Sequence, residues 1–280
     1  MPDTVLGIIG YPVSHSLSPL MHNSAAKDLR LPFVYIAFEV PPASLAKAVA
    51  GMKTLGIAGM NVTVPHKEKI VPLLDALDKG AAEIGAVNTV KNNNGVLTGA
   101  NTDGVGFLRA LKAERFNPRG KRAVIIGAGG SSRAIGVSLC KAGAKEIVVI
   151  NRSEGSGKAL VRHLSRFGKA DFHKSTSPAA RDAVARADLV VQTTPAGMKK
   201  SDPLPLADPP FRKGQLVYDI IYSPGETRFL KAAKKAGANT LNGLSMLVYQ
   251  GSESFKMWTG RRFPEEKVLR LLKKQLGGNR

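Results

Sequence analysis

The feature that most constrains the fold is the segment of residues 121–153, KRAVIIGAGGSSRAIGVSLCKAGAKEIVVINRS. The apolar run AVII enters a cluster of glycines, a helix-forming stretch follows, and a second apolar run ends at Asn151. Two consecutive strands that are joined through a helix lie parallel in one sheet. We therefore predict a complete βαβ unit here, and with it an α/β fold class.

The same alternation of strand and helix signals extends along the rest of the chain. The strand candidates are residues 5–10, 33–40, 57–64, 86–90, 188–194 and 215–221, and helix candidates include residues 20–29, 42–55 and a tail from about residue 245. Short strands that alternate with helices are typical of mainly parallel sheets. We predict two α/β domains, an N-terminal one with a mainly parallel sheet and a C-terminal one with a Rossmann-like doubly wound sheet, with a cleft between them.

The boundaries of these domains follow from where the alternation restarts. The crossings between the domains are expected near residues 101–107 and 238–245. We place the first domain at residues 1–104, completed by the C-terminal helices of residues 245–280, and the second domain at residues 105–244. A chain of 280 residues is long enough for two domains of ordinary size.

The segment GYPVSHSLSPLMHN, residues 10–23, holds an unusual number of polar and turn-forming residues. Ser18 followed by Pro19 predicts a helix start, with the serine as N-cap and the proline in the first turn. That prediction leaves Ser14, His15 and Ser16 without a role. Serines in a turn are most often local capping groups.

The glycine cluster has the context of a dinucleotide-binding turn, because it follows a predicted strand and opens a predicted helix. Gly127 permits the tight turn, and Gly129 lets the backbone approach a pyrophosphate at the helix N-terminus. The cofactor-binding candidates in this turn are Gly127, Ala128, Gly129, Gly130 and Ser131. Ser132 stands where the third glycine of the GxGxxG pattern belongs, so an ordinary strand-to-helix turn stays an alternative.

The end of the next strand bears on which nicotinamide cofactor is bound. NAD sites usually place a carboxylate there, and NADP sites place positive charge near the 2′-phosphate. Here the strand ends in Asn151, Arg152 and Ser153, and Arg152 can hold a phosphate in a bidentate way. We predict NADP from these three residues. The alternatives are that Glu154 reaches the ribose, or that Arg152 is a surface residue without a cofactor role.

The formal net charge of +20 raises the question of a nucleic-acid partner. Lysine and arginine are scattered along the chain, and no zinc-finger spacing or RNP-like aromatic run is present. We therefore expect a solvated basic surface that attracts small anions, and no nucleic acid. The single cysteine, Cys140, the lack of a basic signal-peptide segment and the lack of a long apolar run indicate a cytoplasmic location and no membrane span.

Six ordered segments, which span nearly the whole chain, resemble the shikimate dehydrogenase family. They are HSLSPLMHN, MNVTVPHKE, GAVNTV with GANTDGVGF, GAGGSSRA with NRS, TTPAGM, and YDIIYSP with NGLSMLVYQG. One such motif alone is weak evidence. The full set in this order is specific, and the roles that follow are implied by the resemblance.

The resemblance implies a substrate site in the first domain. Ser14 and Ser16, assisted by Tyr222, hold the carboxylate of the substrate. Lys67 and Asp103 form the catalytic pair, in which the carboxylate favours the charged lysine and fixes its direction. The remaining substrate-binding candidates are Asn61, Thr63, Asn88 and Gln250. His15 is expected to shape its loop, and His66 to be a structural or surface residue.

On the cofactor side, the resemblance adds Thr193, Ile220 and Gly243 as candidates near NADP. The implied reaction is reversible hydride transfer from NADPH to the ketone of 3-dehydroshikimate, which gives shikimate on the route to chorismate and the aromatic amino acids. No metal is expected, because the sequence has no HExxH motif or Cys/His cluster. We expect a monomer or a homodimer.

Two alternatives stay open at this point. The first is a quinate/shikimate dehydrogenase that prefers NAD, against which Arg152 is the main argument. The second, from a different class, is a basic Rossmann-type protein that binds or regulates a partner. The pair of Lys67 and Asp103 speaks against the second alternative, because a binding module has no use for a positioned proton donor.

Overall fold

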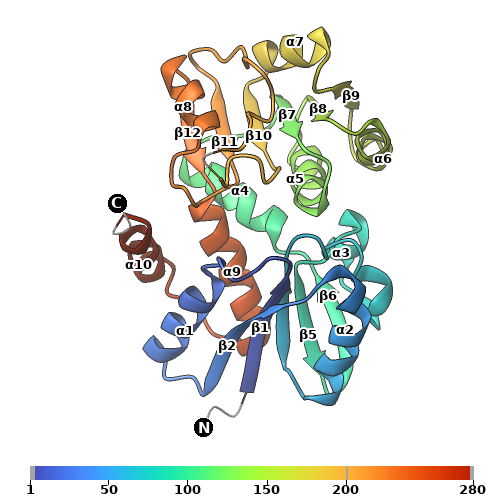
Figure 1. The fold of residues 1–280 in the computed structure, drawn as a ribbon, viewed down its shortest axis with the longest axis vertical. Coiled ribbons are helices and arrows are strands. Elements are labelled where there is room, and N and C mark those ends of the chain that lie inside the picture. Colours follow the sequence, from blue (N-terminus) through green and yellow to red (C-terminus); the bar gives the residue numbers. More distant parts are fainter. Residues whose placement is uncertain (1–3, 200, 278–280) are drawn as a thin grey trace. The chain divides into compact units, whose positions relative to one another are not determined.

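The structure, a computed structural model, describes residues 4–199 and 201–277 and divides the chain into two compact units. Unit 1 comprises residues 1–106 and 247–280, and unit 2 comprises residues 107–246 (Figure 1). The first three and last three residues of the predicted first domain lie outside the described residues. Each unit is built on its own six-stranded sheet.

The sheet of unit 1 has the strand order β2-β1-β3-β5-β6-β4. Its strands are β1 (Thr4–Gly10), β2 (Phe33–Glu39), β3 (Gly59–Val62), β4 (Ala76–Leu77), β5 (Thr89–Asn93) and β6 (Val96–Ala100). β1 pairs in parallel with β2 and β3, and β4 with β6, whereas β5 runs antiparallel to both of its neighbours. Three of the five pairings are parallel, so the sheet is mainly parallel but contains a hairpin.

The hairpin between β5 and β6 turns at Asn94 and Gly95. Both residues have positive φ angles, 51° and 89°, as a two-residue hairpin turn of the I′ type requires. Asparagine followed by glycine is the strongest short-range signal for such a turn, so the hairpin was readable from the sequence although it was not predicted.

Helices cover the sheet of unit 1. They are α1 (Ser18–Asp28), α2 (Leu45–Thr54) and α3 (Lys79–Ile84), with short 3₁₀ turns at Pro42–Ser44 and Val71–Leu73, and α10 (Glu265–Gly277) packs against α1. α4 (Asp103–Ala113) and α9 (Leu244–Thr259) each contribute residues to both units. Trp258 of α9 packs so closely on β3 that a Cβ at Gly59 would lie 2.3 Å from its ring nitrogen.

The predicted serine cap of α1 is wrong by one residue. The helix begins at Ser18 itself, with Leu17 at the N-cap position and Pro19 in the first turn as expected. No side chain caps the helix from Leu17. Instead the hydroxyl of Ser16 accepts a hydrogen bond from the backbone N–H of Ser18 at 3.2 Å, because a serine two residues before the helix reaches its unsatisfied N–H groups.

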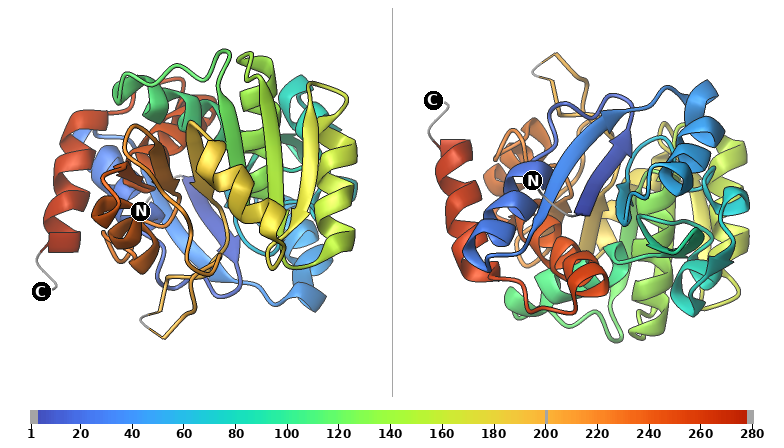
Figure 2. Two further views of the ribbon diagram at one scale, coloured as in Figure 1. Left: turned by 90° about the horizontal axis from the view of Figure 1, so that it is seen from above. Right: turned by 90° about the horizontal axis from the view of Figure 1, so that it is seen from below.

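The sheet of unit 2 is entirely parallel, in the order β12-β11-β10-β7-β8-β9. Its strands are β7 (Arg122–Ile126), β8 (Glu146–Asn151), β9 (Ala170–Lys174), β10 (Leu189–Gln192), β11 (Leu216–Asp219) and β12 (Asn239–Asn242). The helices α5 (Gly130–Lys141), α6 (Glu154–Leu164), α7 (Pro178–Arg186) and α8 (Arg228–Lys235) connect them. Figure 2 shows helices on both faces of this sheet, which confirms the predicted doubly wound fold.

The strand order of unit 2 reverses between β7 and β10. Doubly wound sheets bind ligands outside the carboxyl ends of their strands at such a reversal. β7 leads there into the glycine turn at Gly127, and β10 leads into the segment that starts at Thr193. The fold therefore brings together two segments that were selected from the sequence as cofactor candidates.

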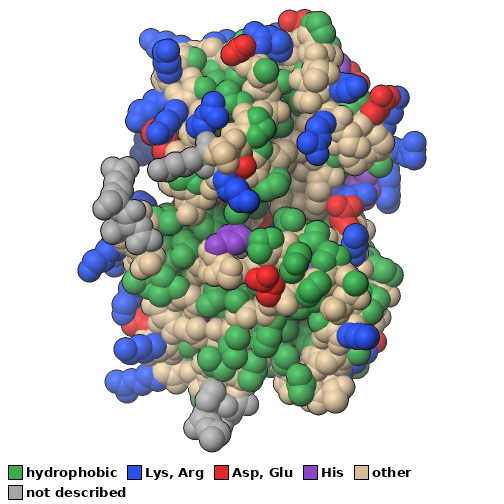
Figure 3. All heavy atoms as spheres, viewed as in Figure 1, with side chains coloured by type: hydrophobic (Ala, Val, Ile, Leu, Met, Phe, Trp, Pro, Cys, Tyr) green, Lys and Arg blue, Asp and Glu red, His purple; other side chains and the backbone are tan. Residues whose placement is uncertain are grey.

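Within the described residues, no helix is both long and apolar enough to cross a membrane. Lysine and arginine side chains are spread over the face drawn in Figure 3 and do not gather in a single patch there. This distribution agrees with the scattered basic residues of the sequence.

Candidate active site

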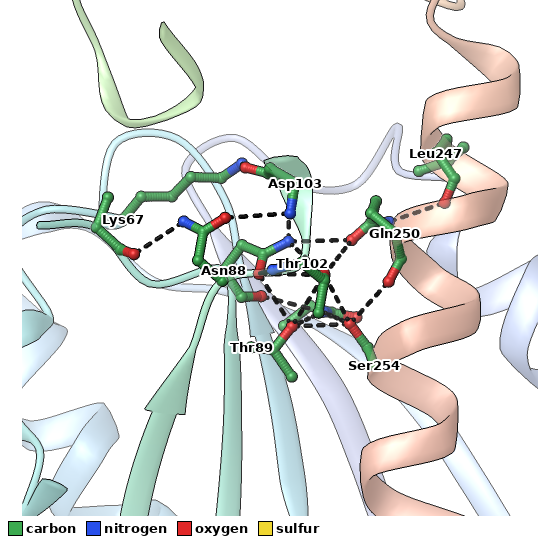
Figure 4. A network of polar contacts seen from close by, with 11 residues as sticks. Lys67, Asn88, Thr89, Thr102, Asp103, Leu247, Gln250 and Ser254 are labelled. Carbon is green, nitrogen blue, oxygen red and sulfur yellow. Dashed lines mark hydrogen bonds and ion pairs between the residues drawn. The ribbon is translucent and has the colours of Figure 1, made fainter. Parts of the chain in front are cut away.

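The centre of the site in unit 1 is an ion pair between Lys67 and Asp103 (Figure 4). Lys67 lies a few residues beyond the end of β3, and Asp103 is the first residue of α4. Lys67 Nζ lies 2.5 Å from Asp103 Oδ2, and the two side chains are only 11% and 5% exposed. The two residues predicted as a catalytic pair are therefore in direct contact.

Asn88 orients the carboxylate of Asp103 from the other side. Its amide nitrogen donates to Asp103 Oδ1 at 2.8 Å, and it also lies within hydrogen-bond distance of Thr102 Oγ1 at 2.9 Å and Gln250 Oε1 at 3.1 Å. The amide oxygen of Asn88 accepts from the backbone N–H of Thr102 at 2.8 Å. Each oxygen of Asp103 thus has its own donor, which holds the carboxylate plane in one orientation.

Three hydroxyl groups complete this network and were not selected from the sequence. Ser254 Oγ lies 2.7 Å from Thr89 Oγ1 and 3.2 Å from Thr102 Oγ1. Ser254 stands four residues after Gln250 on α9, so both side chains face the sheet from the same side of the helix. That spacing was a usable signal, but it identifies the partners only once the position of α9 is known.

Asn61 is buried in the same network and has partners for both of its side-chain groups. Its oxygen accepts from the hydroxyl of Tyr35 at 2.7 Å, and its nitrogen donates to the carbonyl of Asn88 at 3.0 Å and to Ser254 Oγ at 3.1 Å. The structure therefore gives Asn61 a supporting position beneath Asn88. Its predicted contact with substrate stays a prediction.

The polar segment before α1 forms a turn in which the backbone N–H of Ser16 donates to the carbonyl of Val13 at 3.0 Å. Ser14 is exposed and Ser16 is half-buried. Thr63, half-buried just beyond β3, lies next to Gly10 of β1, since a Cβ at that glycine would lie 2.5 Å from the Thr63 methyl group. His66 is buried and pairs with the carbonyl of Val40 at 2.7 Å, so it is structural.

In unit 2, the fold itself requires glycine at residue 127 of the glycine turn but not at residue 129. Gly127 has a φ of 118°, and a Cβ there would lie 2.4 Å from Thr193 Oγ1. A Cβ at Gly129, in contrast, would meet no protein atom within 4 Å. The space beside Gly129 is therefore open at the N-terminus of α5, where backbone N–H groups attract phosphate. The residues present fit a dinucleotide cofactor.

Ser132, which replaces the third glycine of the pattern, braces this turn from inside. It is 1% exposed, and its hydroxyl accepts from the backbone N–H of Gly129 at 3.1 Å. The same hydroxyl lies 2.8 Å from Thr193 Oγ1, which in turn donates to the carbonyl of Ile126 at 2.7 Å. The serine thus ties the turn to the segment after β10, which explains why a residue other than glycine is tolerated there.

The end of β8 presents Arg152 to solvent, and none of the described acidic residues forms an ion pair with it. Asn151 shapes the turn by donating to the carbonyl of Ser153 at 2.8 Å. Glu154 pairs with Lys158 at 2.5 Å, one helical turn further along, and this lysine lowers the pKa of Glu154. The carboxylate that argued for NAD is therefore engaged on its own helix, although such an exposed pair is weak.

Gly243 and Ile220 lie in contact beyond β12 and β11. A Cβ at residue 243 would lie 1.8 Å from the carbonyl oxygen of Ile220, so only glycine allows this approach of the two backbones. The N–H of Gly243 donates to the carbonyl of Ile221 at 3.0 Å. Tyr222 follows in the same segment and is half-buried.

Comparison with known proteins shows similarity over nearly the whole chain. The family model described as Shikimate dehydrogenase substrate binding domain matches residues 8–90. The models described as Shikimate / quinate 5-dehydrogenase and Shikimate 5'-dehydrogenase C-terminal domain match residues 110–199 and 243–273.

Individual relatives agree with these matches. The shikimate dehydrogenase (NADP(+)) of Moorella thermoacetica is 46% identical over 278 residues, which cover 98% of this chain and 94% of the relative. The protein of the same name from Methanopyrus kandleri is 47% identical over 270 residues, covering 94% and 92%. A solved structure of shikimate 5-dehydrogenase from Thermus thermophilus, in complex with NADP(H) and shikimate, has a TM-score of 0.85 at 34% identity and covers 97% of this chain and 99% of that one.

Proposed function

The chain belongs to the shikimate dehydrogenase family, and from this premise we propose that it catalyses the reversible NADPH-dependent reduction of 3-dehydroshikimate to shikimate. The observation that carries the proposal is the nearly buried ion pair of Lys67 and Asp103, held by Asn88. The protein is then an oxidoreductase on the route to chorismate and the aromatic amino acids. A protein that only binds a partner has no need of such a pair.

Lys67 is the proton donor in the direction of reduction. Negative charge develops on the carbonyl oxygen as the ketone is reduced, and an ammonium group beside that oxygen stabilises the charge and then gives up a proton. Asp103 holds the ammonium in place, and Asn88 holds Asp103. In the direction of oxidation the neutral amine of Lys67 accepts the proton of the alcohol.

Hydroxyl and amide groups bind the substrate in this proposal. Ser14 and Ser16 donate to its carboxylate, with Tyr222 as the assisting hydroxyl, because hydroxyl groups rotate onto an anion without titrating. The ring hydroxyls contact Thr63, Asn88 and Gln250, of which Asn88 and Gln250 lie at the ion pair. Asn61 supports Asn88 from below.

NADPH supplies the hydride when it is bound. The residues proposed to hold it are those of the glycine turn, Gly127, Ala128, Gly129, Gly130 and Ser131, together with Asn151, Arg152, Ser153, Thr193, Ile220 and Gly243. The open space beside Gly129 and the exposed guanidinium of Arg152 support this placement. We also propose a cytoplasmic location and a monomer or homodimer, which stay predictions.

The test is a comparison of NADPH with NADH on 3-dehydroshikimate and on 3-dehydroquinate. We expect the highest kcat/KM for NADPH with 3-dehydroshikimate. Higher kcat/KM for NADH with 3-dehydroquinate would instead assign a quinate dehydrogenase. A protein with no turnover on either substrate that retards nucleic acid in a gel at physiological salt would be a binding protein.

A further inference from the structure

A cluster of three buried polar residues in unit 2 has no role in the reaction as described so far. Gln192, Asp219 and Thr227 are 0%, 0% and 1% exposed. Gln192 ends β10 and Asp219 ends β11, and the two residues are paired in register, so they lie side by side at the carboxyl edge of the sheet. Thr227 is the N-cap of α8.

Asp219 fastens both ends of the segment that carries Tyr222. One carboxylate oxygen accepts from the backbone N–H of Ile221 at 3.0 Å, and the other accepts from the hydroxyl of Thr227 at 2.7 Å. Thr227 in turn accepts from the backbone N–H of Leu230 at 3.3 Å, in the first turn of α8. The carboxylate of Asp219 therefore joins the two ends of the loop of residues 220–227 by hydrogen bonds.

Gln192 fastens the segment after β10 in the same way. Its amide nitrogen donates to the carbonyls of Thr194 and Ala196, both at 3.0 Å, and its oxygen accepts from the N–H of Thr194. The same amide nitrogen lies 3.4 Å from Asp219 Oδ1. The segments 193–197 and 220–227 thus meet on one cluster, and Thr193 continues the contacts to Ser132 in the glycine turn.

The charge of Asp219 makes a purely stabilising role a poor explanation. The residue is fully buried, and none of the described basic side chains forms an ion pair with it. Burial raises its pKa to about 6, although Thr227 and Ile221 partly offset the rise. A buried carboxylate without a counter-ion costs stability, whereas a carboxylate that collects several donors defines their geometry.

We propose that Gln192, Asp219 and Thr227 are positioning residues, which hold segments 193–197 and 220–227 in the arrangement that presents the nicotinamide half of the cofactor and the Tyr222 hydroxyl for reaction. The proposal rests on the proposed function, because it assigns these segments to the cofactor. The cluster acts through the segments and touches neither ligand. Its loss therefore lowers turnover more than it weakens cofactor binding, which depends mainly on the glycine turn and Arg152.

The experiment compares Thr227→Val with Thr227→Ser, and with Ser177→Ala as a matched control. Ser177 is the N-cap of α7 in the same unit and accepts from the N–H of Ala180 at 3.2 Å, so its removal also costs one helix cap. We measure hydrogen exchange of the ligand-free protein, the Kd of NADPH by fluorescence, kcat for shikimate oxidation and the melting temperature. Asp219→Asn is a second variant. It replaces one of the two carboxylate oxygens that accept from the Ile221 N–H and the Thr227 hydroxyl.

In Thr227→Val we expect exchange in segments 193–197 and 220–227 to quicken roughly tenfold. kcat falls on the order of tenfold while the Kd of NADPH changes less than about twofold. Asp219→Asn shifts these quantities in the same direction, and Thr227→Ser restores them. Ser177→Ala lowers the melting temperature to a similar degree but leaves exchange in these segments and kcat unchanged.

Two results would overturn the proposal. One is unchanged exchange in both segments in Thr227→Val and Asp219→Asn, and the other is a loss of kcat no larger than in Ser177→Ala. The exchange and NADPH measurements need no turnover. A wild-type protein that binds NADPH but does not oxidise shikimate therefore rejects the proposed function separately, while exchange still decides whether the cluster holds the segments.

Discussion

At the scale of single residues, the two oxygens of Asp103 have different partners, Lys67 on one side and Asn88 on the other. This arrangement leaves the carboxylate little freedom to rotate, and the direction of the lysine is set with it. Lys67 alone is then the group that meets the charge of the reacting oxygen. Asn88 acts on Lys67 through Asp103, in addition to its proposed contact with the substrate.

Lys67→Ala is expected to lower kcat by a factor on the order of 10² to 10⁴, because it removes a positioned proton donor. The KM for shikimate changes far less, since the serines and the amides remain. Asp103→Asn also lowers kcat, and the double variant is less than additive because the two residues act as one unit. Steady-state kinetics of the three variants test this. Near-normal kcat in Lys67→Ala would make the lysine a substrate ligand only.

Arg152→Ala is expected to weaken NADPH by about 1.5 to 3 kcal/mol, the scale of a hydrogen bond to a charged group, and to leave NADH nearly unchanged. The control is Arg162→Ala, which removes an equal charge from an exposed position on α6. Dissociation constants for both cofactors, measured by fluorescence, decide the matter. An equal loss of affinity for NADPH and for NADH would show that Arg152 does not bind the 2′-phosphate.

His22 predicts how stability depends on pH. It is fully buried between aromatic rings, 4.4 Å from the ring of Tyr35, with no hydrogen-bond partner for either nitrogen. Burial lowers its pKa from 6.5 to about 3. Below pH 6.5 the unfolded chain therefore binds a proton that the folded chain excludes, and the free energy of unfolding falls by up to about 1.4 kcal/mol per pH unit until about pH 3.

His22→Phe is expected to lose this part of the acid sensitivity, because phenylalanine keeps the stacking and takes up no proton. Urea unfolding of both proteins at several pH values between 4 and 7 measures the difference. Asp219 has the opposite sign, since its raised pKa lets the folded state bind a proton first below about pH 6, but it is present in both proteins and cancels. Parallel curves for the two proteins would contradict the assignment to His22.

At the scale of elements, the turn between β7 and α5 contains one glycine that the fold requires and one whose space is left for a ligand. Gly127 combines a positive φ with a close neighbour, Thr193, so the protein itself excludes a side chain there. Gly129 has neither constraint, since a Cβ at that position would meet open space. A glycine without a structural reason, at the start of a helix, indicates room left for a phosphate.

Gly129→Ala is therefore expected to lower the melting temperature only slightly, by the small preference of an N-cap for glycine over alanine, and to raise the Kd of NADPH roughly tenfold, which is about 1.4 kcal/mol. Gly127→Ala lowers the melting temperature, because the alanine is strained and clashes with Thr193. Thermal melts and NADPH titrations of the two variants test the pair. Normal NADPH affinity in Gly129→Ala would show that the open space is not used by the cofactor.

At the scale of the whole molecule, the positive charge is divided unequally. Residues 107–246 hold 25 Lys and Arg against 10 Asp and Glu, a net charge of +15 out of the +20 of the chain. This is the unit that carries the glycine turn and Arg152. A field of this sign attracts a polyanionic cofactor over distances of about the Debye length, which is about 10 Å at 0.1 M salt.

Raising the ionic strength from about 0.05 to about 0.5 M is expected to raise the KM for NADPH severalfold. The KM for shikimate changes less, because the substrate carries a single charge and the other 140 residues carry only +5. kcat stays constant, because the ion pair of Lys67 and Asp103 is nearly buried and salt screens buried pairs little. Initial rates over this range measure all three quantities. Equal effects on the two KM values would show that the uneven charge does not act on the cofactor.

The sequence by itself determined the types of element and much of the chemistry. Periodicity and glycine placement located β1, β2, β3 and β5 of one sheet, β7, β8, β10 and β11 of the other, and the βαβ unit, because these signals are local. The short strands β4, β6, β9 and β12 were not predicted. Lys67 and Asp103 were selected through the resemblance, and the structure brings them to 2.5 Å. Arg152 at the end of β8 was likewise readable, since a strand end is a local feature.

Only the tertiary structure decided which distant groups meet. β5 pairs antiparallel with β3, a strand order that no local signal encodes. Asn88 and Gln250 are 162 residues apart, and they meet because α9 returns to the sheet of unit 1. The burial of His22 and the meeting of Gln192 with Asp219 have the same origin. A hydrogen bond or a desolvated group depends on all of its neighbours, and those neighbours are supplied by packing between elements, which no single segment of the sequence contains.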